Sequence, residues 1–311
     1  MSKISVIGFY PWVKYICKAH IFNPFWVSAS ERRRLRESAR LEYKTHYLEK
    51  YLPFIKSLKV SDNIPNPYLF NEDKIFSFWA QGLDGSPHIV RQCIDSIKNQ
   101  FGERFIFLTS NNLKEYVDIP EFILHKFNSG KISYAHLSDI FRLELLYKYG
   151  GYWFDATDFV TGDIWDNIKK ADFFMFRSSD RMLSHMFVMN SFIRGKKGDP
   201  LTRMWVDLLY EYWKNEDIAI EYFFAHMLFR LLVTHNDQAK ELFKKMPVME
   251  MDPTHVLWHE IGNHKFDYVG YEKMKSNAFF QKCSYKPQRR GVNSLIPGSF
   301  AEVVINDKTH K

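Results

Sequence analysis

The stretch Ser138–Asp158, SDIFRLELLYKYGGYWFDATD, decides the fold of this 311-residue chain. It begins as an amphipathic helix, stops at Gly150 and Gly151, and continues as a short aromatic strand that ends in Asp155. Glycine is favoured just past the end of a helix because it adopts positive φ without strain. We therefore predict a helix over 133–149 that leads directly into a buried strand.

The same alternation of strand and helix extends along the chain in both directions. Apolar, aromatic runs predict further strands at 74–82, 104–110, 171–178 and 184–193. Helices are expected at 87–101, 111–117, 120–127, 200–213 and 218–233. This order predicts an α/β domain with a mostly parallel central sheet flanked by helices.

Residues 1–60 differ from the rest of the chain in charge. They hold twelve Lys and Arg against four Glu, whereas the remaining residues are close to neutral. A helix over 28–59 is expected, either lying on an anionic membrane surface or packing one face on the main body. Pro65 and Pro67 mark a boundary, which divides a basic helical extension, 1–67, from one domain, 68–311.

Charge and cysteine content restrict the function and the compartment. The main domain has no persistent basic stripe, so nucleic-acid binding is not expected. The three cysteines are far apart and form no CxxC motif, which favours a reducing compartment. The N-terminal apolar stretch is too short and interrupted to span a bilayer. We expect a cytoplasmic protein, peripheral on the inner face of the cytoplasmic membrane.

Candidate ligand-binding residues lie at the ends of three predicted strands: Gln81 and Gly82, Ser110, and Asp155. Ligands in such sheets bind at the carboxyl ends of strands. A single Asp there is often only a turn residue. Asp155 and Asp158, three apart, together predict a site for Mg²⁺ or Mn²⁺ that shares its ligands with phosphates.

Asp139 and Arg142 lie three apart on the predicted helix, so both emerge from one face. An exposed ion pair there contributes little, but this helix is apolar on several sides. We therefore expect both residues to contact a ligand. Gly150 and Gly151 allow a ligand to approach the backbone closely.

Three further residues are weaker candidates. Lys282 near a diphosphate would stabilise a departing nucleotide. Asn190 lies near the end of a predicted strand, and we expect it to contact the sugar. The histidines near 255–264 do not have the HExxH spacing of a zinc protease, so we place His255 at the metal or phosphate site.

Three blocks of sequence carry a resemblance to a known family: FWAQG at 78–82, RQCIDSIK at 91–98, and residues 105–157. They resemble the bacterial capsular polysaccharide synthesis glycosyltransferases. These are related to family 32-like sugar transferases, which carry a DXD motif after a Ser-Asp-x-x-Arg helix and a Gly-Gly pair. The resemblance spans roughly residues 74–290, with weaker matches at 221–229 and 280–286.

The resemblance implies a single GT-A-like nucleotide-sugar-binding domain. It implies transfer, with retention and metal assistance, from a UDP-sugar to a hydroxyl of a capsular or other surface polysaccharide precursor, including a lipid-linked glycan. By position, Asp139 and Arg142 would contact the donor, Gln81 would lie in the first nucleotide loop, and Asp155 would be the first acid of DXD. Thr157 replaces the second acid, so Asp155 is the firmer ligand.

Two alternatives remain open at this point. A sugar-phosphate nucleotidyltransferase uses a similar α/β layer, but its first loop carries Arg or Lys, and QGLDGSPH at 81–88 has neither. A non-catalytic scaffold of a polysaccharide-assembly complex would use the basic N-terminal helix to dock on lipid.

Overall fold

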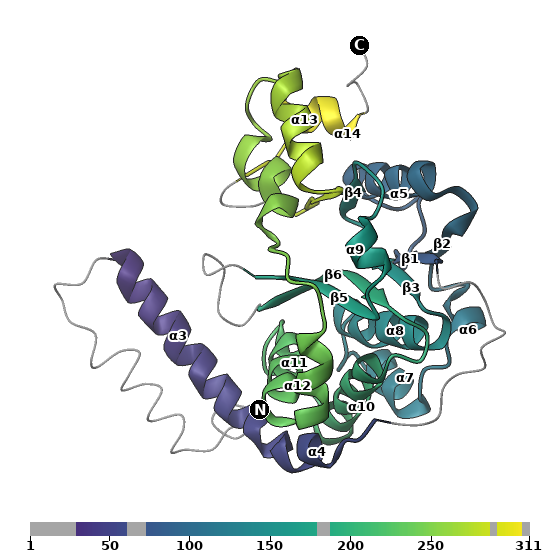
Figure 1. Ribbon diagram of the computed structural model, residues 1–311, viewed down its shortest axis with the longest axis vertical. Coiled ribbons are helices and arrows are strands. Elements are labelled where there is room, and N and C mark those ends of the chain that lie inside the picture. The colour runs from purple at the N-terminus through teal and green to yellow at the C-terminus, as the bar shows by residue number, and fades with distance from the viewer. Residues whose placement is uncertain (1–28, 61–72, 179–186, 287–290, 307–311) are drawn as a thin grey trace.

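The computed structural model describes residues 29–60, 73–178, 187–286 and 291–306 (Figure 1). The proposed boundary at residues 67–68 and the N-terminal 28 residues lie outside this part of the chain. The elements follow in chain order: α3 (Ala29–Leu48), η2 (Glu49–Tyr51), α4 (Leu52–Ser57), β1 (Ile75–Phe78), α5 (His88–Phe101), η3 (Gly102–Arg104), β2 (Phe105–Leu108), α6 (Leu113–Tyr116), α7 (Glu121–Asn128), α8 (Tyr134–Tyr149), β3 (Gly151–Phe154), β4 (Asp158–Val160), α9 (Asp166–Lys169), β5 (Phe173–Arg177), β6 (Val188–Gly195), α10 (Pro200–Asn215), α11 (Phe224–His235), α12 (Asp237–Lys244), η4 (Asp252–His255), η5 (Leu257–Ile261), α13 (Tyr268–Asn277), β7 (Phe280–Lys282) and α14 (Phe300–Ile305).

The central sheet has five strands in the order β2-β1-β3-β6-β5 and is mixed. β1 pairs in parallel with β2 and with β3, but β6 runs antiparallel to both β3 and β5. The prediction of a mostly parallel sheet is therefore wrong for the half of the sheet that contains β6 and β5. The segment between Arg177 and Val188 is shorter than the dozen or more residues that a parallel crossover requires, so β5 and β6 pair as antiparallel neighbours.

The predicted transition from α8 to β3 is confirmed. Ser133 caps α8 by accepting a hydrogen bond from the His136 amide, and Gly150 ends it with φ of 71°. Gly151 then has φ of 104°, and a Cβ there would lie 2.2 Å from the Lys74 carbonyl oxygen. Only glycine lets β3 start this close to the segment before β1.

Helices cover both faces of the sheet (Figure 1). On one face α8 packs on β3 and β6, α10 packs on α8, and α11 lies beside α10 with its Phe229 ring 6.0 Å from that of Phe173 in β5. On the other face α5 contacts β2 and β4. Many of the aromatic residues fill the core between these layers, and the largest fully buried ones include Phe76, Phe141, Trp153, Phe154, Phe174, Phe192 and Trp205.

A second, two-stranded sheet brings the C-terminal part of the chain to the end of β3. β7 pairs antiparallel with β4, and Lys282 lies directly opposite Asp158. Residues directly opposite in an antiparallel pair project their side chains to the same face. The β4–β7 pairing therefore fixes Lys282 beside the turn that follows β3.

The basic helix α3 continues through η2 into α4, and α3 and α4 both contact α11. Arg40 and Lys44 pair with Glu221, and Lys50 pairs with Glu216, which also accepts hydrogen bonds from tyrosines of this segment. Acids of the main body thus neutralise part of the positive charge of this segment.

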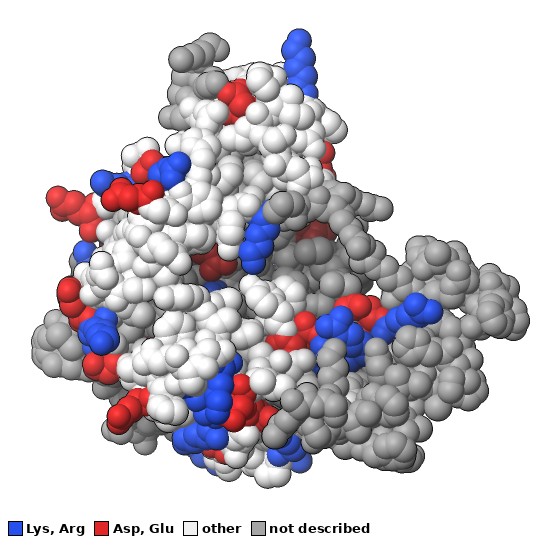
Figure 2. All heavy atoms as spheres, turned by 180° about the vertical axis from the view of Figure 1, so that it is seen from behind, with Lys and Arg blue, Asp and Glu red and all other residues white. Residues whose placement is uncertain are grey.

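On the face drawn in Figure 2, basic and acidic side chains of the described residues are interspersed, and these residues form no large patch of a single charge. Within the described ranges, every helix is too short or too polar to cross a bilayer.

Candidate functional site

A cavity of about 770 Å³ opens where β1 and β3 end. This is the edge of the sheet at which α/β folds bind ligands, and the volume suits a small-molecule ligand. Its lining comes from segments far apart in the chain: Phe78, Trp79, Ala80, Gln81, Tyr134, Ala135, Ser138, Asp139, Arg142, Trp153, Asp155, Ala156, Thr157, Met189, Asn190, Ser191, Tyr222, Phe223, His226, His255, His259 and residues 282–286.

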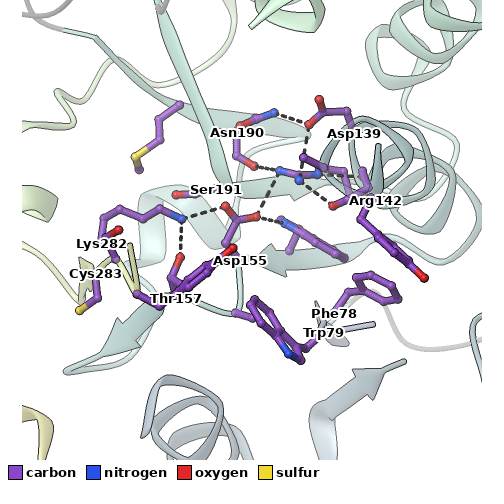
Figure 3. A pocket seen from close by; sticks show the side chains of 18 of the residues that line it. Phe78, Trp79, Asp139, Arg142, Asp155, Thr157, Asn190, Ser191, Lys282 and Cys283 are labelled. Carbon is purple, nitrogen blue, oxygen red and sulfur yellow. Dashed lines mark hydrogen bonds and ion pairs between the residues drawn. The ribbon is translucent and has the colours of Figure 1, made fainter. Parts of the chain in front are cut away.

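Asp155 is the centre of the charged network in this cavity (Figure 3). Its Oδ1 accepts a hydrogen bond from Trp153 Nε1 at 2.9 Å and lies 3.3 Å from Arg142 Nη1. Its Oδ2 accepts a hydrogen bond from Lys282 Nζ at 2.8 Å. Burial by itself raises the pKa of Asp155, but the positive charges of Lys282 and Arg142 outweigh it, so the pKa is lowered.

Arg142 is a fixed positive charge in the cavity wall. Its Nε donates to the Ser138 carbonyl at 3.0 Å, Nη2 to Ser138 Oγ at 2.7 Å, and Nη1 to the Asn190 carbonyl at 2.6 Å. The guanidinium also lies 5.0 Å from the centre of the Trp153 ring. These contacts leave Arg142 only 6% exposed, yet it still lines the cavity.

Asp139 lies beside Arg142 and is held by Asn190. Asn190 Nδ2 donates to Asp139 Oδ1 at 2.9 Å, and Arg142 Nη2 is 3.5 Å from the same oxygen. Burial raises the pKa of Asp139 to about 6, with a further contribution from the negative charge of Asp155. Asp139 is therefore mostly ionised at neutral pH and can accept a hydrogen bond from a ligand hydroxyl.

Lys282 lies on the opposite side of Asp155 from Arg142 (Figure 3). Besides Asp155, its Nζ donates to Thr157 Oγ1 at 2.9 Å and lies 3.2 Å from Asp158 Oδ1. Burial lowers the pKa of Lys282, but Asp155 and Asp158 raise it further than burial lowers it. Lys282 therefore stays protonated at neutral pH.

Asp158 has no surface in the cavity. It is fully buried, and its Oδ2 accepts a hydrogen bond from the Asp155 amide at 3.2 Å, which closes the turn after β3. Burial and the negative charge of Asp155 together raise its pKa to about 7, against the opposing effect of Lys282. The geometry gives Asp158 a structural role in this turn.

Several of the predicted site residues lie apart from the cavity. Gln81 lines it, whereas Gly82 and Ser110 do not. Gly150 and Gly151 lie at the end of β3 opposite to Asp155, where Gly150 ends α8 and Gly151 lies against the Lys74 backbone. The two glycines therefore serve the transition from α8 to β3.

The predicted metal ligands do not assemble into a cation site. Among the residues that the structure describes, no group of three or more His, Cys, Asp or Glu is placed to hold a metal. His255 lines the cavity, but its Nδ1 lies 3.1 Å from the Met251 carbonyl, and burial lowers its pKa to about 4. Mg²⁺ and Mn²⁺ require free oxygen ligands, whereas both oxygens of Asp155 already accept from nitrogen donors. This donor set does not fit a divalent cation.

A family described as capsular polysaccharide synthesis protein matches residues 26–297. The chain belongs to this family. It is also 26% identical over 179 residues to the O-glycosyltransferase braB of Annulohypoxylon truncatum, which covers 52% of this chain and 42% of that relative. The chain thus spans less than half of the length of this fungal protein.

A solved structure, the PaToxG glycosyltransferase, aligns with 68% of this chain and 85% of its own. The sequence identity is 14% and the TM-score is 0.38, which is too low to establish a shared fold.

Sequence reasoning missed several lining residues of this capsular polysaccharide synthesis protein. Trp79 follows β1 directly, and its ring lies 5.3 Å from that of Tyr285, edge to face. Tyr222 enters from the segment before α11. Trp79 and Tyr285 both lie in blocks that carry the family resemblance, so the sequence did contain information that could have identified them as site residues. Nothing local distinguishes Tyr222 from a core aromatic residue.

Proposed function

We propose that this protein is a GT-A-type glycosyltransferase that moves a sugar from a UDP-sugar to a hydroxyl of a surface polysaccharide precursor. The observation that carries the proposal is the pair of cations, Arg142 and Lys282, on either side of Asp155 in a cavity at the strand ends. Membership of the capsular polysaccharide synthesis family supports it, as does similarity to a protein named as an O-glycosyltransferase.

The chemistry requires stabilisation of a leaving group. In the proposed reaction the bond between the anomeric carbon and the diphosphate oxygen breaks, and a bond to the acceptor oxygen forms. The acceptor proton passes to the departing diphosphate, so that retention needs no separate base. Arg142 and Lys282 stabilise the negative charge that develops on the diphosphate.

The remaining lining residues suit the rest of a nucleotide sugar. Asp139 accepts a hydrogen bond from a sugar or ribose hydroxyl, and Asn190 holds it in place for this. The exposed faces of Trp79 and Tyr285 offer apolar surface to a base or a sugar ring. Tyr222 extends this surface near α11.

The test is release of UDP from a panel of UDP-sugars, with and without glycan acceptors. Asp155→Ala removes the carboxylate that orients both cations, so we expect turnover to fall by about 100-fold or more. Asp166→Ala is the matched control, because Asp166 is an exposed acid on α9 outside the cavity. Full turnover in Asp155→Ala, or no UDP release by the wild type, refutes the proposal.

A further inference from the structure

The ammonium group of Lys282 is surrounded by oxygens in the way that a bound cation is. It lies 2.8 Å from Asp155 Oδ2, 2.9 Å from Thr157 Oγ1 and 3.2 Å from Asp158 Oδ1. These are the acids that the sequence assigns to a divalent metal, together with the hydroxyl that lies between them in the chain. One side chain of this protein therefore already occupies the position between them.

We propose that Lys282 takes the place of a divalent cation, so that this site binds a nucleotide diphosphate without a metal. The inference rests on the proposed function and specifies how its donor site works. Arg142, on the other side of Asp155, supplies the second positive charge. Two monovalent side chains together provide the charge that one divalent ion would carry.

The fold fixes Lys282 in this position from two directions. The antiparallel register of β4 and β7 places it directly opposite Asp158. Hydrogen bonds to Asp155 and Thr157 then orient the end of the side chain toward the cavity. An ammonium held by its own strand pairing needs no ion from solution to preserve the geometry of the two acids.

A metal ion has no free ligands here while Lys282 is in place. Asp158 is fully buried and does not line the cavity, and one of its oxygens accepts from the Asp155 amide. Both carboxylate oxygens of Asp155 accept from nitrogen donors. Six oxygen ligands at about 2.1 Å, which Mg²⁺ prefers, require the ammonium to leave first.

Lys282 nevertheless retains the capacity to bind a phosphate oxygen. An ammonium has three N–H donors, and two of them serve Asp155 and Thr157. Lys282 Nζ also lies 3.2 Å from Asp158 Oδ1, in an ion pair with a carboxylate outside the cavity. Because Lys282 lines the cavity, we expect a diphosphate there to draw one of its N–H donors away from Thr157 or Asp158.

The deciding experiment is calorimetric titration of the full wild-type chain with UDP and with GDP, in EDTA and again in excess MnCl₂. We expect one of the two nucleotides to bind with a dissociation constant that changes by less than about threefold between the two conditions. Binding that is lost in EDTA and restored by Mn²⁺ overturns the inference but leaves the proposed function intact. Failure of both nucleotides to bind under either condition overturns both.

Variants supply an independent check. Lys282→Ala removes a charged donor, and we expect it to weaken nucleotide binding in EDTA by about ten- to a hundredfold. Lys282→Arg keeps the positive charge and should retain more of the affinity than Lys282→Ala. Comparing the two variants separates the effect of losing the charge from the effect of disturbing the fold. Lys275→Ala, which removes a lysine paired with Glu272 on α13, is the matched control and should bind as the wild type does. Wild-type affinity in Lys282→Ala contradicts the inference.

Discussion

Replacing Arg142 with alanine tests whether the guanidinium stabilises the fold in addition to its proposed role in ligand binding. The side chain is only 6% exposed, donates three hydrogen bonds, and pairs with Asp139 and Asp155. Removing one partner of a buried ion pair typically costs about 3–5 kcal/mol, because the remaining charge is left uncompensated. Asp155 keeps Lys282 as a partner, so we expect a loss near the lower end, about 3 kcal/mol, in the free energy of unfolding.

The assay is urea denaturation followed by tryptophan fluorescence, with Arg40→Ala as the matched control. Arg40 pairs with Glu221, but its side chain is 44% exposed, so its removal should cost no more than about 1 kcal/mol. If Arg142→Ala loses no more stability than Arg40→Ala, the guanidinium is not held among buried carboxylates, and the geometry given for this site is wrong.

Three further predictions concern the fold around the site. Gly151→Ala places a Cβ 2.2 Å from the Lys74 carbonyl oxygen at φ of 104°, so we expect a loss of at least about 2 kcal/mol in urea denaturation; an unchanged midpoint refutes this. Burial raises the pKa of Asp199 to about 6, above the value of about 4 that an Asp has in an unfolded chain. The protonated carboxyl therefore stabilises the folded state fully below about pH 4, and this stabilisation is lost as the pH rises through about 6. Asp199→Asn keeps the helix cap but does not titrate. Its free energy of unfolding, measured by urea denaturation, should therefore rise relative to that of the wild type by up to about 3 kcal/mol as the pH increases from about 4 to about 8. A difference between the two proteins that does not change with pH contradicts this. Glu216→Ala removes the acid that pairs with Lys50, so limited trypsin digestion should cut residues 29–57 faster than in wild type or in the surface control Glu241→Ala; equal rates count against this.

The local part of the fold and of the site could be read from the sequence. Gly150 ends α8 and Asp155 follows β3, as the stretch 138–158 predicts. The three-residue spacing of Asp139 and Arg142 puts both on the side of α8 that faces the cavity. These features depend on helix and strand periodicity, which the sequence displays directly.

Features that depend on pairing between distant segments could not be read in this way. The direction of β6 depends on the short connection after β5, which the apolar pattern of the strands does not reveal. The side on which Asp158 lies depends on its pairing with β7. The acids that neutralise Arg40 and Lys50, Glu221 and Glu216, lie more than 160 residues away in the chain.

The domain boundary after Pro67 and membrane binding by residues 1–60 stay predictions. Helix α3 contacts α11, as expected for a helix that packs one face on the main body, and this contact does not test membrane binding. Liposome flotation with anionic and neutral lipid remains the measurement for the membrane hypothesis.

The pairing of β4 with β7 also affects how the protein is made. Asp155 leaves the ribosome 127 residues before Lys282, the ammonium that joins it. Until translation reaches β7, the acids after β3 have no lysine beside them and the cavity lacks one wall. On the proposed function, we therefore expect a product released before β7 is synthesised to bind no nucleotide sugar, even if the central sheet had formed.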